Sequence, residues 1–205
     1  MRSDNVTWHE GSLSREQRWD ALGRSGATIW LTGLPGAGKT TLAQTIEAAL
    51  LKAGRPAYRL DATTLRDGVC SDLGYSSDDR KENNRRLAEL ARLFGDAGTI
   101  AIIAAVSPFA EGRSAARRVH EQNGIPFIEV FVNTPLAVCV ERDPSGIYHR
   151  AIDRDLRDVP GFDLTYEPPL APEVEVTPDV TPTRALDLIA AALHAQTGAP
   201  AFDNG

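Results

Sequence analysis

The sequence has few of the features that mark exported or metal-binding proteins. It contains two cysteines among 205 residues, Cys70 and Cys139, and their separation fits neither a metal site nor a redox pair. Cys139 lies in the apolar run 136–140, where a buried structural thiol is the simplest interpretation. The N-terminus has no signal-peptide pattern. We therefore expect a cytoplasmic protein in a reducing compartment.

Long apolar runs and basic clusters are also missing. No apolar stretch approaches the roughly 18 residues of a membrane-spanning helix, so we expect no membrane insertion. Acidic residues outnumber basic ones by 28 to 22, which gives a net charge of −6, and there is no basic run or arm. This balance argues against nucleic acid as a partner. Small anionic substrates remain possible, because local arginines decide their binding.

The sequence does contain a complete phosphate-binding motif, G-x-x-x-x-G-K-[ST], at residues 33–40. The apolar residues 28–31 before it predict a buried strand, and 41–51 after it predict a helix. Glycines let consecutive backbone N–H groups surround a phosphate, and the start of the helix favours its negative charge. Lys39 would reach the β- and γ-phosphates, and the Thr40 hydroxyl would ligate Mg²⁺. A glycine-rich turn without a ligand is the alternative, which the coincidence of strand, motif and helix disfavours.

The motif therefore predicts that the chain binds ATP with Mg²⁺. The expected nucleotide-binding residues are Gly33, Leu34, Pro35, Gly36, Ala37, Gly38, Lys39, Thr40 and Thr41, with Thr40 also as the metal ligand.

Two further expected strands end in polar residues. Residues 56–61 predict a strand that ends at Asp61, and the nearly continuous apolar run 99–106 predicts a central strand that ends at Ser107. In open parallel sheets the ligand lies beyond the carboxyl ends of the strands, so both residues should face the site. A solvated turn aspartate is the alternative for Asp61.

A helix over 78–97 should direct polar residues toward the same site. Its apolar stripe includes Leu87 and Ala91, and steps of four and three residues back from Leu87 reach Asn83 and Arg80. These two side chains should point inward near the N-terminus of the helix, where an anionic ligand could meet them.

The remaining segments complete an α/β fold. We expect helices over 110–123, from 135 and over 182–195, and strands over 126–132 and 173–177. Together they predict a phosphate-loop kinase fold, a doubly wound parallel five-stranded sheet of order 2-3-1-4-5 with helices on both faces. Residues 1–26, with Trp8 and a helix over 14–22, would form a helical appendage to a kinase domain over 27–205.

The charged, proline-bearing residues 143–169, named the lid segment below, should form a mobile lid, because phosphoryl transfer to an alcohol must exclude water. A plain surface excursion is the alternative interpretation.

Between 26 and 193 the chain resembles the adenylyl-sulfate kinases, which transfer the γ-phosphoryl group of ATP to the 3′-hydroxyl of adenosine 5′-phosphosulfate. The specific matches outside the phosphate motif are residues 30–34, 73–76, 79–80, 82–83, 107–110, 129–132, 142–143, 146–148 and 166–168. Residues 6–9 and 14–18 also resemble the start of stand-alone bacterial members. The resemblance implies an enzyme of sulfate assimilation, and we expect a homodimer.

The resemblance also implies roles for single residues. Lys39, Asp61 and Ser107 would be catalytic, and Ser107 matches a family serine described as a phosphorylated intermediate, although in-line transfer needs only positioning, Mg²⁺ and a proton acceptor. Residues implied in acceptor binding are Asp61, Arg66, Tyr75 for the adenine, Arg80, Asn83, Val106 and Ser107, with Arg150 in the lid. The forked guanidinium groups of Arg66 and Arg80 suit phosphate oxygens.

Three departures from the family pattern fall on the acceptor side. Thr63 replaces the second aspartate after Asp61, Ser145 replaces a lid lysine, and Val159 replaces a phenylalanine that would stack on the acceptor adenine. The chain could therefore be an adenylyl-sulfate kinase with a compensated pocket or a related kinase of another small hydroxylated molecule. A regulatory module that binds ATP without transferring it is a third possibility.

Overall fold

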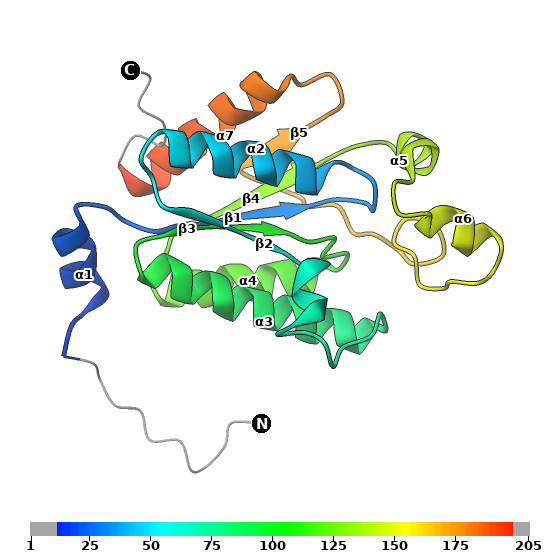
Figure 1. The fold of residues 1–205 in the computed structure, drawn as a ribbon, viewed down its shortest axis with the longest axis horizontal. Helices are drawn as coiled ribbons and strands as arrows, with labels where there is room; N and C mark the ends of the chain where they lie inside the picture. Colours follow the sequence, from blue (N-terminus) through cyan, green and yellow to red (C-terminus); the bar gives the residue numbers. More distant parts are fainter. Residues whose placement is uncertain (1–11, 199–205) are drawn as a thin grey trace, which may run out of the picture.

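Five parallel strands form the centre of the structure, a computed structural model that describes residues 12–198 (Figure 1). The strands are β1 (Ala27–Thr32), β2 (Ala57–Asp61), β3 (Ile100–Ala104), β4 (Phe127–Val132) and β5 (Val174–Val176). Their order in the sheet is β2-β3-β1-β4-β5, which confirms the predicted order. β1 lies between β3 and β4, and all six of its residues are buried, as expected of a central strand covered on both faces.

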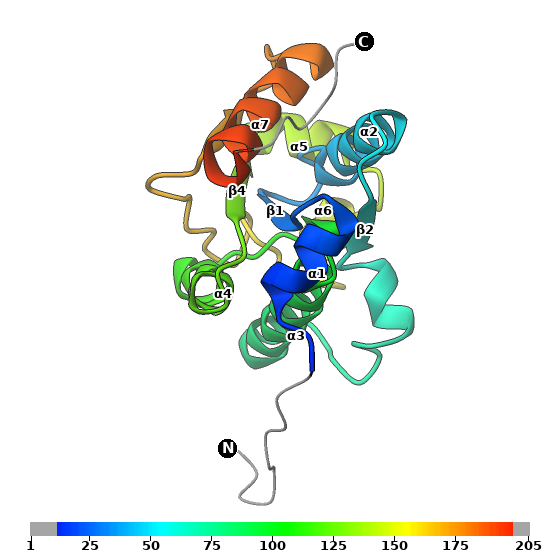
Figure 2. The same ribbon diagram turned by 90° about the vertical axis from the view of Figure 1, so that its left-hand side faces the viewer.

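Four helices cover the two faces of this sheet, and the other described helices lie at its ends (Figure 1). The described helices are α1 (Arg15–Leu22), α2 (Lys39–Lys52), α3 (Ser77–Asp96), α4 (Ala110–Gln122), α5 (Leu136–Arg142), α6 (Ile147–Ile152) and α7 (Pro182–Thr197), with a 3₁₀ turn, η1, at Thr64–Asp67. Figure 2 shows α2 and α7 on one side of the strands and α3 and α4 on the other. No helix in residues 12–198 is long and apolar enough to cross a membrane.

The alternation of side chains along β1 divides the core into two clusters. Ile29 and Leu31 pack on the side of α2 and α7, with Ile46 and Ile189. Trp30 points to the opposite face and packs in the cluster that contains Leu87, Ala88 and Ala91 of α3. The amphipathic stripe predicted for α3 is thus correct, since Leu87 and Ala91 are fully buried.

The N-terminal helix α1 is fastened to the end of the sheet opposite the phosphate loop (Figure 1). Ser14 caps the helix by accepting a hydrogen bond from the backbone of Gln17. Trp19 Nε1 donates to the carbonyl oxygens of Gly95 and Asp96, at 3.1 and 3.2 Å. The predicted helix and the packing of Trp19 are present, whereas Trp8 lies outside the described residues.

The lid segment contains a helix that the sequence interpretation missed. α6 spans Ile147–Ile152, and Asp143 accepts hydrogen bonds from the backbone N–H groups of Tyr148 and His149 at its start. Tyr148 is fully buried, and its hydroxyl donates to the Pro35 carbonyl at 2.9 Å. This part of the lid segment therefore packs directly against the phosphate loop.

Candidate active site

The phosphate loop joins the end of β1 to the start of α2. Gly38 has a φ of 103° just before the helix, a conformation that L residues with side chains rarely adopt, so the turn requires a glycine. Lys39 is buried, and its Nζ donates to the carbonyl oxygens of Gly33 and Leu34 at 3.0 and 2.8 Å. Burial lowers the pKa of Lys39 to about 8, although the negative charge of Asp61 opposes this shift. A bound phosphate would favour the charged state of this amine.

Asp61 lies at the carboxyl end of β2, directly beside the first turn of α2. The Thr40 hydroxyl donates to Asp61 Oδ2 at 2.8 Å, and the backbone N–H of Thr63 donates to Oδ1 at 2.9 Å. Arg59 Nη1 is 3.5 Å from Oδ2. Two oxygen groups therefore meet at the phosphate loop, and such hard oxygen ligands suit Mg²⁺.

A cavity of 590 Å³ runs from the phosphate loop to α3 and the lid segment. It is the meeting point of most residues that the sequence predicts for the site. Those that line it are Pro35, Gly36, Lys39, Thr40, Asp61, Arg66, Tyr75, Arg80, Asn83, Val106, Ser107 and Arg150. The other residues of the predicted nucleotide set, Gly33, Leu34, Ala37, Gly38 and Thr41, do not line this cavity.

Two arginines enclose Tyr75, on the side of the cavity where the sequence predicts acceptor binding. The guanidinium of Arg66 lies 4.2 Å and that of Arg80 5.4 Å from the centre of the ring, which is a cation–π geometry. Arg66 Nη1 donates to the carbonyl oxygens of Leu73 and Gly74, and Arg80 Nε donates to that of Tyr75. Burial lowers the pKa of Arg80, and the charge of Arg66 adds to this effect. An anion between the two guanidinium groups would relieve their repulsion.

Asn83 points inward, as predicted, and is 5% exposed. Its Oδ1 is buried and has no hydrogen-bond partner in the structure. A buried unpaired oxygen is unfavourable, and here it belongs to a residue that lines the cavity. A ligand hydroxyl or amino group would satisfy it.

Ser107 adopts a left-handed backbone conformation, with a φ of 45°. Its Oγ accepts a hydrogen bond from Trp30 Nε1 at 3.2 Å and donates to Asn84 Oδ1 at 3.3 Å. The residue is 2% exposed, so the hydroxyl is held by buried neighbours while the residue lines the cavity. Its predicted catalytic role stays a prediction.

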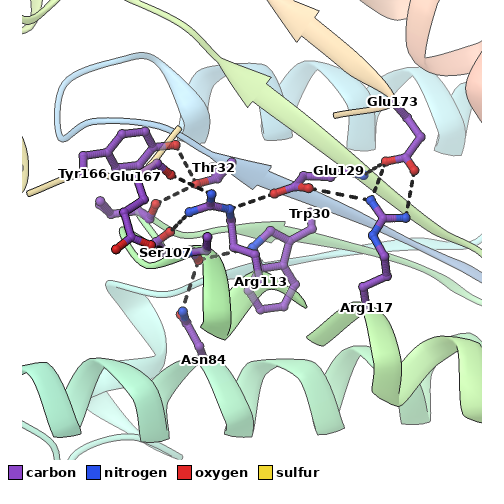
Figure 3. A network of polar contacts seen from close by, with 12 residues as sticks. Trp30, Thr32, Asn84, Ser107, Arg113, Arg117, Glu129, Tyr166, Glu167 and Glu173 are labelled. Carbon is purple, nitrogen blue, oxygen red and sulfur yellow. Dashed lines mark hydrogen bonds and ion pairs between the residues drawn. The ribbon is translucent and has the colours of Figure 1, made fainter. Parts of the chain in front are cut away.

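The sequence interpretation missed the polar network behind Ser107, which Figure 3 shows. Arg113 on α4 and Glu129 on β4 form a buried ion pair with Nε and Oε1 2.8 Å apart. Glu129 could have indicated this network from the sequence, because a glutamate buried within the apolar strand 127–132 must have a partner. What could not be predicted is which arginine supplies it.

The three residues predicted to depart from the family pattern, Thr63, Ser145 and Val159, all line the cavity. Thr63 and Ser145 are exposed at its rim, whereas Val159 is 1% exposed and packs against the core beneath α2 and α7. Substitutions at Thr63 and Ser145 should therefore have little effect on the fold, whereas a substitution at Val159 would disturb the packing of the core.

Comparison with known proteins agrees with this geometry. The family model described as adenylylsulphate kinase matches residues 25–177. The chain is 46% identical to the adenylyl-sulfate kinase of Citrobacter koseri, over 86% of this chain and 87% of that protein. It is 43% identical to the adenylyl-sulfate kinase of Penicillium chrysogenum, over 85% and 86%. The structure of the Mycobacterium tuberculosis APS kinase in complex with AMPPNP and APS superposes with a TM-score of 0.81. That match has 42% identity and covers 83% of this chain and 99% of the other.

The family model extends from before β1 through β5, and the relatives align over most of the chain. The chain belongs to the adenylyl-sulfate kinase family.

Proposed function

We propose that the chain transfers the γ-phosphoryl group of ATP to the 3′-hydroxyl of adenosine 5′-phosphosulfate, giving 3′-phosphoadenosine 5′-phosphosulfate and ADP in sulfate assimilation. The observation that carries this proposal is the single cavity that joins the phosphate loop to Arg66, Arg80 and Asn83. One end of the cavity offers a lysine and a helix N-terminus to phosphates, and the other offers two cations and an unpaired amide oxygen.

Mg²⁺ fits the donor end of the cavity. Thr40 would hold the ion, and Asp61, whose Oδ2 accepts the Thr40 hydroxyl bond, would orient that ligand and the water around it. When bound, the ion would neutralise charge on the β- and γ-phosphates.

The residues of the chain would act mainly by positioning and charge stabilisation. Lys39 would leave the loop carbonyls and contact the β- and γ-phosphates. The acceptor oxygen would form a bond to the γ-phosphorus as the bond from that phosphorus to the oxygen bridging it to the β-phosphorus breaks. Asp61 would accept the proton of the acceptor hydroxyl or orient that hydroxyl for attack.

The acceptor would bind across α3 and the lid segment. Arg66 and Arg80 would grip the phosphosulfate, Tyr75 would contact the adenine, and Asn83 would pair with a polar group of the nucleotide. The lid segment, with Arg150, would close over the substrates and exclude water.

Thr63, Ser145 and Val159 favour one alternative, a relative that phosphorylates a hydroxyl of another small molecule. All three line the acceptor side of the cavity, so together they could change which acceptor fits.

The organisation of the chain completes the proposal. We propose an appendage over residues 1–26, of which the structure describes 12–26, and a kinase domain over 27–205, described to residue 198. We also propose that the protein acts as a homodimer in the cytoplasm, with small molecules rather than nucleic acid or a membrane as its partners.

The test is ADP release by the purified protein, measured with and without adenosine 5′-phosphosulfate. Saturable, Mg²⁺-dependent release at micromolar acceptor supports the proposal. Absence of turnover at millimolar acceptor contradicts it, and a panel of hydroxylated nucleotides and metabolites then tests the alternative. Release that depends on one acceptor excludes a module that only binds ATP.

A further inference from the structure

A buried arginine outside the cavity connects two of the segments that shape it. Arg113, on α4, is 3% exposed, and Nε of its guanidinium pairs with Glu129. Its other two nitrogens donate to backbone carbonyls. Nη1 donates to the Ser107 carbonyl at 2.7 Å, and Nη2 donates to the Glu167 carbonyl at 2.6 Å. One side chain thus bonds to the turn after β3 and to the end of the lid segment.

Four more hydrogen bonds join the same two segments, and Figure 3 shows the one between Thr32 and Tyr166. The Glu167 N–H donates to the Pro108 carbonyl at 2.8 Å, and the Ala110 N–H donates to Glu167 Oε2 at 2.7 Å. Thr32 Oγ1 bonds to both the Val106 carbonyl and the Tyr166 hydroxyl, at 2.7 and 2.9 Å. We call Thr32, residues 106–110, Arg113 and residues 166–167 the clasp.

The clasp holds a backbone conformation that the chain would not otherwise favour. Ser107 is not a glycine, yet its φ of 45° lies in the left-handed region, and such residues persist only where their surroundings fix them. Arg113 holds its carbonyl, and Trp30 holds its hydroxyl. Val106, Ser107 and Pro108 line the cavity, so the conformation of this turn sets the shape of its wall.

We propose that Arg113 is a positioning residue for acceptor binding. It does not line the cavity and acts through others. Its bonds hold the turn at 106–108 and connect residues 166–167 of the lid segment to that turn. A shift of residues 166–167 would therefore also change the shape of the acceptor pocket. The nature of the acceptor, an anionic nucleotide, rests on the proposed function, whereas the mechanical role of Arg113 does not.

Arg117 provides a matched control for this proposal. It lies one turn further along α4 and belongs to the same network, with Nη1 and Nη2 each 2.8 Å from Glu173 and Nη2 3.6 Å from Glu129. No bond links it to the turn at 106–108 or to residues 166–167. Arg113→Lys keeps the buried charge opposite Glu129, but a lysine cannot bond to Glu129 and to both carbonyls in the same geometry. Arg117→Lys likewise replaces a guanidinium group by an ammonium group, but at a position outside the clasp.

The experiment compares both variants with the parent by steady-state kinetics and thermal unfolding. Arg113→Lys should raise KM for adenosine 5′-phosphosulfate about tenfold or more, with KM for ATP nearly unchanged, because a shifted wall weakens the acceptor pose alone. Arg117→Lys should lower Tm but should not raise the KM for adenosine 5′-phosphosulfate relative to the KM for ATP. The proposal would be overturned if the two variants changed both KM values equally. It would also be overturned if the rise in acceptor KM were proportional to the loss of Tm in both variants.

A second measurement separates this proposal from the proposed function. Amide hydrogen exchange, without substrates, should become about tenfold faster at residues 106–110 and 166–167 in Arg113→Lys, and remain at the parental rate there in Arg117→Lys. If the parent fails to phosphorylate adenosine 5′-phosphosulfate but this exchange pattern is found, the acceptor is wrong and the clasp stands. Unchanged exchange at both segments contradicts the clasp, whatever the acceptor.

Discussion

The donor and acceptor ends of the cavity are held by different kinds of contact. The phosphate loop is fixed by residues distant in sequence, since the Tyr148 hydroxyl bonds to the Pro35 carbonyl and the Thr134 hydroxyl bonds to that of Ala37. At the acceptor end Arg66 and Arg80 bond to carbonyls at 73–75, within eight residues of themselves, and Arg80 reaches only the Asp158 carbonyl further away. Tyr75 between them is half exposed.

This difference fits the predicted departures from the family pattern at Thr63 and Ser145, whereas the buried Val159 falls outside this explanation. A substitution in the phosphate loop would disturb contacts with the lid segment and the loop before α5, so its cost would spread through the core. A substitution at Thr63 or Ser145, both exposed, affects little beyond the ligand. The acceptor end is therefore where specificity can change without loss of the fold.

Loss of the donor-end cation should have the largest effect. Lys39→Ala removes the charge that would neutralise the γ-phosphate, and we expect kcat to fall by at least about 10²–10³. The free energy of unfolding should change by less than about 1 kcal/mol, because the variant also removes the cost of burying the amine. Lys52→Ala, at the other end of α2, is the control and should leave both quantities unchanged. Near-parental activity of Lys39→Ala would show that the loop does not bind the transferred phosphate.

The carboxylate at the border of the two ends should come next. Asp61→Asn keeps the shape of the side chain but removes the negative charge beside Thr40, and kcat should fall by about 10² if the residue is a base or orients the metal ligand. Asp67→Asn, on the exposed η1 turn nearby, should have little effect. A decrease smaller than threefold for Asp61→Asn would make it a turn residue only.

A change at the acceptor end should have a smaller effect and could have the opposite sign. Val159→Phe adds a ring at the cavity wall, and stacking on the acceptor adenine should strengthen its binding by about 1–3 kcal/mol if the acceptor is adenosine 5′-phosphosulfate. The KM for this acceptor measures the gain, and Val69→Phe, at a half-exposed position outside the cavity, is the control.

The same variant tests whether the pocket has been redirected. If the natural acceptor is another molecule, Val159→Phe together with Thr63→Asp and Ser145→Lys should leave adenosine 5′-phosphosulfate a poor substrate while impairing the true reaction. If it is adenosine 5′-phosphosulfate, Thr63→Asp with Ser145→Lys should raise kcat. Because Val159 is buried, unfolding must be measured as well, since overpacking would raise KM through damage to the fold.

The sequence predicted the architecture because local patterns determine it. Apolar runs of strand length and helical stripes predicted the strands, and the strand order was taken from the usual order of doubly wound sheets. The inward direction of Asn83 followed from the spacing back from Leu87, and its burial confirms it. These are features in which each residue is interpreted against neighbours a few positions away.

The features that were missed depend on contacts between distant residues. Helix α6 has only six residues, too few for a periodic pattern, and its Tyr148 is buried against the phosphate loop more than a hundred positions away. The partners of Arg113 come from β4, the turn after β3 and the lid segment, so no spacing along α4 could identify them. A sequence shows that Glu129 needs a partner, but the fold decides which one it has.

A buried histidine at the end of the sheet away from the cavity should affect the stability of the fold but not catalysis. We expect its effect to be smaller than those of Lys39→Ala, Asp61→Asn and Val159→Phe. His120 is fully buried at the end of α4, with Nδ1 2.8 Å from the Ala116 carbonyl and Nε2 2.8 Å from Thr28 Oγ1. Both nitrogens are thus satisfied in a neutral ring that donates from Nδ1. Burial lowers the pKa of His120 below 6.5, and Arg92 lowers it further, while Glu89 and the bond to Ala116 oppose the shift.

The sign of the pH effect follows from that shift. The unfolded chain binds a proton at His120 near pH 6.5, whereas the folded protein does so only at lower pH, so the unfolding free energy is highest above pH 6.5. It should fall as the pH drops from 6.5 toward the folded pKa, with a slope of at most about 1.4 kcal/mol per pH unit from this group. Denaturant unfolding at several pH values measures the slope, and His120→Gln should remove that part of it. Because His120 lies away from the cavity, KM for both substrates should not follow the same curve. A parental slope retained in His120→Gln would assign the acid sensitivity to the carboxylates instead.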